Sequence, residues 1–92
     1  MAYQEDVNKL SDATKDMHRA ITSLVEELEA VDWYNQRVDI CSDDELREIL
    51  AHNRDEEKEH AAMILEWIRR KDPTFDHELR DFLFTEKSIT HK

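Results

Sequence analysis

Apolar residues recur every three or four positions over two long stretches of the chain. This spacing is that of one face of an α-helix, and the first series predicts a helix over about residues 11 to 39. A second series starts at Leu46 and predicts another helix that ends near Arg70. The positions of the first series, each called a rung, are Leu10, Thr14, Met17, Ile21, Leu24, Leu28, Val31, Asn35 and Val38.

Short local signals place the helix boundaries. Ser42 followed by Glu45 matches a capping box, which predicts Ser42 as the N-cap of the second helix. Asp72-Pro73 supplies an N-cap and a proline at the first helical position, so a short third helix is predicted over residues 73 to 84. Its apolar positions are Phe75, Leu79 and Phe82.

The expected fold is all-α: an antiparallel two-helix hairpin plus a short C-terminal helix. The chain has no glycine and one proline, so a sheet with tight turns is disfavoured. Its 92 residues suggest one domain, 1–92, whose ends at 1–10 and 86–92 carry no pattern and are expected to be flexible. A hairpin closes no core by itself. We therefore expect a homodimer that forms a four-helix bundle.

Charge and composition narrow the partners. The formal net charge is −10, which argues against nucleic acid and anionic membranes, because both require a basic patch. No apolar run approaches a membrane span, and the N-terminal residues lack secretory character, so a cytoplasmic protein is expected. The lone Cys41 gives no intrachain disulfide and is expected in the connection between the long helices.

The apolar face of the second helix is interrupted by polar residues. Asn53, Glu57 and His60 occupy three consecutive rungs between apolar ones. Glu57 and His60 form an E-x-x-H motif, whose side chains project from one helix face and can hold an ion between them. Asn53 is interpreted as an interhelix hydrogen bonder. The full stripe is Leu46, Leu50, Asn53, Glu57, His60, Ile64 and Trp67.

Glu27 is the residue expected to face this motif. Glu27 and Glu57 lie roughly 21–23 Å from the turn at about 1.5 Å per residue, and hence side by side across the hairpin. One chain thus supplies half of a carboxylate-bridged di-iron set, and a homodimer would complete it. Two iron ions per dimer, one per chain, would cancel four carboxylates. Oxygen-rich ligation without thiolate fits iron or manganese, and zinc could compete.

Alternatives remain open from the residues alone. The Glu–His pair could be a hydrogen-bonded interface that fixes register in a non-catalytic helical-hairpin assembly protein, with or without a structural metal. An oxygen carrier of the hemerythrin kind would need several histidines per site. Tyr34, seven residues after Glu27 on the same face, could reach the site with its phenol or simply pack.

Four strings closely resemble the encapsulated ferritins, over about residues 11 to 87: EELEAVDWYNQRVD (26–39), HNRDEEKEHAAM (52–63), LEWIRR and DFLFTE. The resemblance implies that the dimer is a ferritin-like four-helix bundle with a ferroxidase centre at its interface. The family's ligands fall on Glu27, Glu57 and His60, with a nearby tyrosine at Tyr34. The acidic residues through which iron is proposed to enter fall on Glu26 and Glu29, with a tryptophan at Trp33.

The resemblance also implies an assembly and a function. Family members form a ring of five dimers inside an encapsulin shell, so the expected location is an encapsulin nanocompartment in the cytoplasm. Loading uses a short C-terminal peptide, and the printed sequence, which ends Thr90-His91-Lys92, contains no such segment. The expected activity is oxidation of Fe(II) to Fe(III) with oxygen, feeding iron storage in that compartment.

Overall fold

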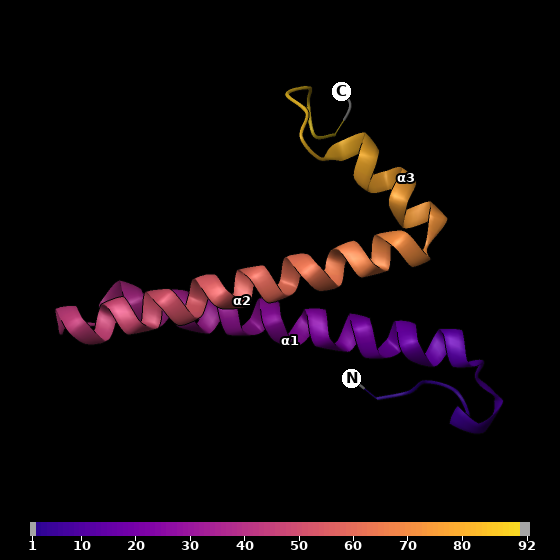
Figure 1. Ribbon diagram of the computed structural model, residues 1–92, viewed down its shortest axis with the longest axis horizontal. Helices are drawn as coiled ribbons and strands as arrows, with labels where there is room; N and C mark the ends of the chain where they lie inside the picture. The colour runs from indigo at the N-terminus through magenta and orange to yellow at the C-terminus, as the bar shows by residue number, and fades with distance from the viewer. Residues whose placement is uncertain (1, 91–92) are drawn as a thin grey trace.

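The computed structural model describes residues 2 to 90, and its regular structure is entirely helical. A short 3₁₀ helix η1 (Val7–Lys9) precedes α1 (Asp12–Ile40), α2 (Asp44–Lys71) and α3 (Pro73–Phe82). Helices α1 and α2 run antiparallel, and α3 turns away from the far end of α2 (Figure 1). The predicted all-α hairpin with a short C-terminal helix is confirmed. The flexibility expected at residues 1, 91 and 92 lies outside the described residues.

Side-chain caps start the helices, and one differs from the prediction. Asp43, not Ser42, is the N-cap of α2: its Oδ1 accepts a hydrogen bond of 2.7 Å from the Leu46 amide. The prediction of Ser42 was wrong because an ionised carboxylate is the stronger acceptor and also favours the positive end of the helix dipole. Asp72 caps α3 as predicted, accepting from the Phe75 amide at 2.9 Å.

The connection between the long helices is short and tied down. Cys41 is the C-cap of α1, as its expected place in the connection requires. The guanidinium of Arg47, on the first turns of α2, donates two hydrogen bonds of 3.0 and 2.8 Å to the Cys41 carbonyl. One of the carbonyls left open at the end of α1 is thereby satisfied.

The N-terminal segment, which has no helical pattern, nonetheless packs on the hairpin. Asp6 caps η1 by accepting a hydrogen bond of 3.0 Å from the Asn8 amide. The Tyr3 ring stacks on His18 of α1 with ring centroids 4.2 Å apart. No helix within residues 2–90 is both long enough and apolar enough to cross a membrane.

The hairpin buries very little. Among residues 2–90 only Ala61 and Ile68 are buried, both on α2. Large apolar side chains on the two predicted stripes or beside them stay exposed, including Leu28 (54%), Leu46 (47%) and Met63 (58%). Contiguous apolar surface on a small acidic protein is typical of an interaction face.

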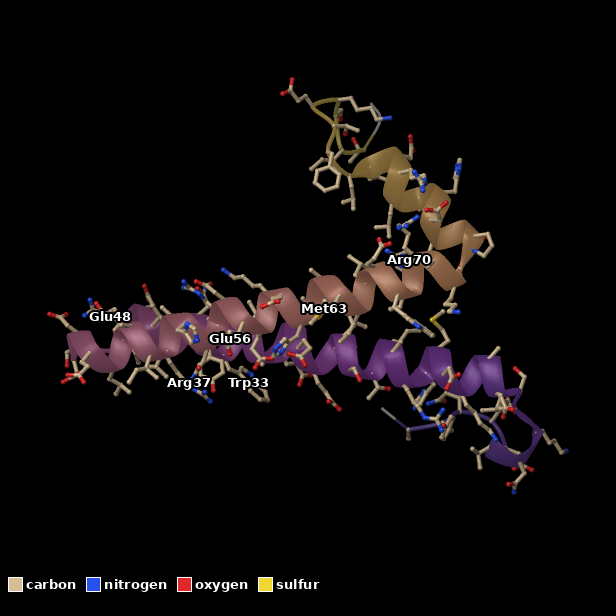
Figure 2. All side chains as sticks on the ribbon, viewed as in Figure 1. Trp33, Arg37, Glu48, Glu56, Met63 and Arg70 are labelled. Atoms are coloured by element: carbon tan, nitrogen blue, oxygen red, sulfur yellow. The ribbon has the colours of Figure 1, made fainter. Side chains whose placement is uncertain are left out.

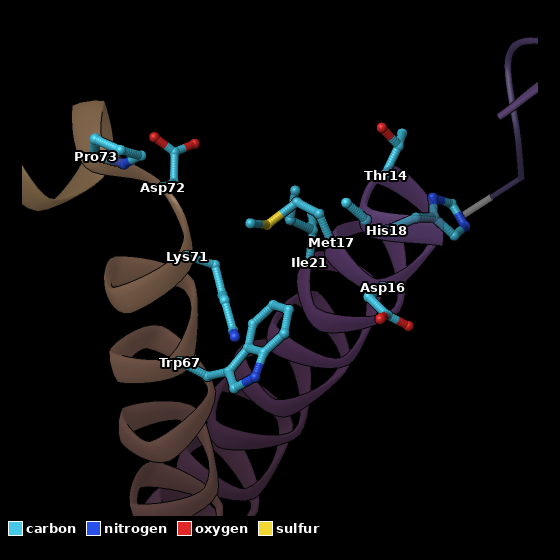
Figure 3. Close-up of a pocket in the computed structure, with 10 residues that line it drawn as sticks. Thr14, Asp16, Met17, His18, Ile21, Trp67, Lys71, Asp72 and Pro73 are labelled. Carbon is cyan, nitrogen blue, oxygen red and sulfur yellow. The ribbon is translucent and has the colours of Figure 1, made fainter. Parts of the chain in front are cut away.

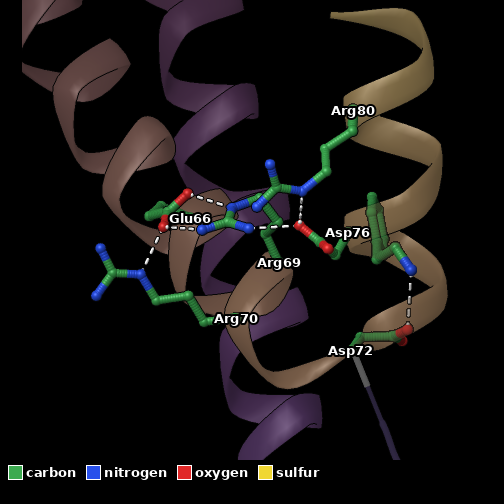
Figure 4. A network of polar contacts seen from close by, with 7 residues as sticks. Glu66, Arg69, Arg70, Asp72, Asp76 and Arg80 are labelled. Carbon is green, nitrogen blue, oxygen red and sulfur yellow. Dashed lines mark hydrogen bonds and ion pairs between the residues drawn. The ribbon is translucent and has the colours of Figure 1, made fainter.

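An ionic network fixes the angle between α2 and α3 (Figure 4). Arg69 donates to both oxygens of Glu66 at 2.7 Å and to Asp76 on α3. Arg70 donates to Glu66 at 2.5 Å, and Arg80 to Asp76 at 2.9 Å. The hydrogen bonds from Arg69 and Arg70 lower the pKa of Glu66 to about 2, and Arg69 also lowers the pKa of Asp76.

Acidification should therefore release α3. The folded-state pKa of Glu66 lies below its ordinary value of 4.5, so its stabilising contribution is complete above pH 4.5 and is lost as the pH falls towards about 2. Amide hydrogen exchange of residues 73–82, expressed relative to the intrinsic rate at each pH, should accelerate in that window. Glu66→Gln should accelerate it already at pH 7, whereas Glu78→Gln, outside the network, should not. Equal protection in Glu66→Gln and wild type would contradict this account.

The cap of α2 gives a second prediction. Asp43→Ala should lower the free energy of unfolding of the metal-free protein by about 1 kcal/mol, because the Leu46 amide loses its acceptor. Ser42→Ala is the matched control and should change it by no more than a few tenths of that. Urea denaturation followed by circular dichroism measures both, and a larger loss in Ser42→Ala would restore the capping-box assignment.

Candidate metal centre

The hairpin brings together Glu27 of α1 and Glu57 and His60 of α2. Nδ1 of His60 lies 3.5 Å from Oε2 of Glu27 and 3.5 Å from Oε2 of Glu57. One potential ligand atom from each residue lies within 4.8 Å of the other two. Glu27 precedes Cys41 by fourteen residues and Glu57 follows Asp43 by fourteen, so antiparallel helices set them level. His60 joins because residues i and i+3 share a helix face.

Glu27 carries an unsatisfied oxygen. Its Oε2 is buried and has no hydrogen-bond partner among the described residues. The 3.5 Å separation from His60 is too long for a hydrogen bond. A buried carboxylate oxygen left without a partner is costly, and a cation is the partner that offsets the charge most directly.

The donor set fits a divalent cation. Two carboxylates and a neutral imidazole carry a charge of −2 and contain no thiolate. Nitrogen and oxygen ligands lie about 2.0–2.2 Å from a first-row metal, so the ligand atoms of a loaded site lie within about 4.4 Å of one another. The observed 4.8 Å limit needs only a small contraction to reach this. Such ligands suit iron or manganese, and zinc also accepts them.

The cluster opens to one side. The side chains of Glu27 and Glu57 are 23% and 25% exposed, and that of His60 is 43% exposed. Three ligand atoms from one chain are fewer than the four or more that these metals take. Further ligands would have to approach from the open side.

The other residues singled out from the sequence lie outside this cluster. Tyr34 is half-buried on α1, with the Arg37 guanidinium 4.9 Å from its ring centroid, and no hydrogen bond within residues 2–90 joins its phenol to the cluster. Glu26 and Glu29 are exposed and are not gathered with Glu27. Trp33 is 53% exposed and lies on the same edge of the hairpin as Arg37 (Figure 2).

The interhelix hydrogen bond expected from Asn53 is made by another residue. Nη1 of Arg54 donates to Oδ1 of Asn35 at 3.1 Å, while Asn53 has no side-chain hydrogen bond within the described part of the chain. In the sequence, Arg54 lies beside the apolar stripe, a position that predicts a solvent-exposed residue. The sequence feature that could have indicated the hydrogen bond is the place of Arg54 one turn before Glu57, opposite a polar position of α1.

A hollow between α1 and α2 lies away from the cluster. It has a volume of about 960 Å³ and sits where the N-terminal half of α1 faces the end of α2 (Figure 3). Trp67 reaches from α2 towards Met17 and Ile21 of α1 across it. No residue of the cluster lines this hollow, so the hollow is not part of the candidate metal centre.

Comparisons of sequence place these features among known proteins. A sequence model described as EncFtn-like matches residues 2–86. An encapsulated ferritin-like protein of Rhodospirillum rubrum is 62% identical over 86 residues, which cover 94% of this chain and 61% of that protein. A ferritin-like protein of Thermotoga maritima is 56% identical over 88 residues, covering 96% and 77%. An encapsulin nanocompartment cargo protein of Myxococcus xanthus is 43% identical over 47 residues, covering 51% and 36%.

The fold recurs in a solved structure. The crystal structure of protein ne0167 from Nitrosomonas europaea has 70% sequence identity and a TM-score of 0.94, and the match covers 99% of this chain and 100% of that one. The family match spans nearly the whole chain, and the Rhodospirillum relative is 62% identical over 94% of this chain. The chain therefore belongs to the EncFtn-like family of encapsulated ferritin-like proteins.

Proposed function

We propose that this protein is a ferroxidase whose di-iron centre forms when two hairpins pair. The observation that carries the proposal is the buried, partnerless Oε2 of Glu27 beside Glu57 and His60. Membership of the EncFtn-like family supports an iron-handling role for this donor set. Fe(II) is the substrate, one ion per chain and two per dimer.

Pairing completes the ligand set. A two-fold axis places the same patch of both chains face to face, so a second Glu27, Glu57 and His60 approach from the open side. Exposed apolar residues, such as Leu28 and Met63, provide surface for such an interface. Four carboxylates in one dry space repel one another, and two divalent ions cancel them. Metal binding and dimer assembly are therefore coupled.

Each residue has a distinct role in the proposed reaction. Glu57 and His60 hold one iron in each half, His60 as neutral imidazole, and Glu27 bridges or caps the pair. Two Fe(II) ions would together give two electrons to one O₂, which takes up two protons from water and leaves as hydrogen peroxide, with two Fe(III) as the other product. Tyr34 is the nearby phenol. Glu26 and Glu29, beside Trp33, form the outer acidic path by which Fe(II) reaches the centre.

The oxidised iron is stored outside the protein itself. We propose that a ring of five dimers, each chain a single domain of residues 1–92, is held inside an encapsulin shell in the cytoplasm. The Myxococcus relative is an encapsulin nanocompartment cargo protein, which supports this partner. A thin hairpin encloses no volume for a mineral, so Fe(III) would pass to the surrounding compartment.

One alternative keeps the geometry but removes the chemistry. His60 is 43% exposed and lies 3.5 Å from each carboxylate. A polar interface without metal, or a structural metal site, is compatible with the same geometry. The protein would then be a non-catalytic helical-hairpin assembly protein. Its rate of oxygen consumption with Fe(II) would not exceed the protein-free rate.

Removing the imidazole tests the centre. Wild-type protein should bind about one Fe(II) per chain anaerobically and consume oxygen on aeration. His60→Ala should slow consumption by more than about 100-fold, because loss of a ligand exceeds the cost of altering its outer partners. His52→Ala is the matched control: His52 is exposed on the same helix and pairs only with Glu56, at 2.8 Å. Undiminished oxidation by His60→Ala would rule out the centre.

Neutralising Glu27 tests the coupling of metal to assembly. Sedimentation should show that anaerobic Fe(II) shifts wild-type protein from monomer to the dimer or the ring of dimers and that a chelator reverses the shift. Glu27→Gln removes two of the four clustered charges, so it should dimerise more readily without metal and respond less to it. Glu48→Gln, exposed on α2, should behave as wild type. Assembly that ignores both metal and chelator would favour the non-catalytic alternative.

A further inference from the structure

A single polar link joins the two long helices near the candidate metal centre. Arg54 of α2 donates through Nη1 to Oδ1 of Asn35 on α1 at 3.1 Å. Its side chain is 21% exposed, and its Nε donates to Asp55 at 3.1 Å, so the guanidinium is held at two points. Within residues 2–90, the other side-chain hydrogen bonds between the ends of α1 and α2 are those from Arg47 to the Cys41 carbonyl, at the turn itself.

The link lies between the turn and the cluster. Arg54 precedes Glu57 by three residues, which is about one helical turn. Asn35 follows Glu27 by eight residues, or about 12 Å along α1. The link is therefore close enough to the cluster to restrain the sliding and rotation of α2 relative to α1 there.

Apolar packing alone specifies this arrangement weakly. The stripes of both helices repeat every three or four residues, so a shift by one turn again sets apolar residues against apolar residues. Such a shift moves Glu27 by about 5.4 Å relative to its partners, which exceeds the 4.8 Å span of the ligand atoms. The turn restrains sliding at its own end, but it leaves the rotation of α2 fourteen residues away unrestrained. A hydrogen bond between the helices is directional and restrains both.

We propose that Arg54 and Asn35 are positioning residues, which hold α1 and α2 so that Glu27 faces Glu57 and His60. This inference rests on the proposed role of the cluster as an iron site. Asn35 suits the task because its amide oxygen accepts the hydrogen bond without a charge. An aspartate there would add another anionic ligand on the face that already carries Glu27.

The test is a double-mutant cycle read out as metal affinity. Zn²⁺ is the probe because it does not react with oxygen, and calorimetry measures its dissociation constant. Arg54→Gln and Asn35→Ala should each weaken binding about fivefold, the usual value of one hydrogen bond. The double variant should bind no more weakly than either single, because both remove the same link. Asn35→Ala places a strong helix former at an exposed position and keeps the cycle informative if Arg54→Gln misfolds.

Lys58→Gln is the matched control. Lys58 is next to Glu57 and also carries a positive charge, but it pairs with Asp55 of its own helix at 3.1 Å. Its loss should leave Zn²⁺ affinity within twofold of wild type. Variants of Arg54 and Asn35 that melt earlier but bind Zn²⁺ as wild type would overturn the inference and leave the centre intact. If His60→Ala also binds as wild type, the proposed function fails, and the inference with it.

Discussion

One unsatisfied carboxylate oxygen is the constraint on which the proposed chemistry of this hairpin depends. Oε2 of Glu27 is buried, yet His60 stands at 3.5 Å, beyond hydrogen-bond reach. A buried anionic oxygen without a hydrogen-bond partner is unfavourable, so a positively charged group beside it would be stabilising. The adjacent Glu57 and His60 offer further ligand atoms at the same place, so a shared cation satisfies all three residues at once.

The apolar surface of the hairpin also lacks a partner within the chain. A hairpin of two long helices buries only Ala61 and Ile68 among the described residues and leaves its apolar stripes partly or fully exposed. Burying that surface between two copies gains about 25 cal/mol per Å², while pressing the acidic clusters together opposes it. The proposed metal resolves the conflict because it removes the repulsion at the place where the surfaces meet. In the proposed dimer, assembly and formation of the site would therefore be one event.

The helices and the pairing of Glu27 with Glu57 could be predicted from the sequence because both depend on local patterns and distances along the chain. Periodicity and capping residues located the helices, and equal distances from the turn set Glu27 opposite Glu57. What failed depended on competition between neighbours: Ser42 and Asp43 can both cap, and pattern alone does not rank them. The Arg54–Asn35 link was missed because Arg54 lies off the apolar stripe. The orientation of α3 depends on Arg69 reaching Asp76, a side-chain contact that leaves no periodic trace.

The structure explains why Glu27 has no lysine or arginine partner in a chain with 13 such residues. The basic residues nearest Glu57 on α2, Arg54 and Lys58, both donate to Asp55, and these hydrogen bonds lower the pKa of that carboxyl group. Asp55 therefore stays ionised and keeps both cations engaged on α2. At the far end of α2, Arg69 and Arg70 are engaged by Glu66. With the neighbouring arginines and lysine engaged elsewhere, none of them occupies the space between Glu27, Glu57 and His60, which leaves these ligand atoms available to a cation from solution.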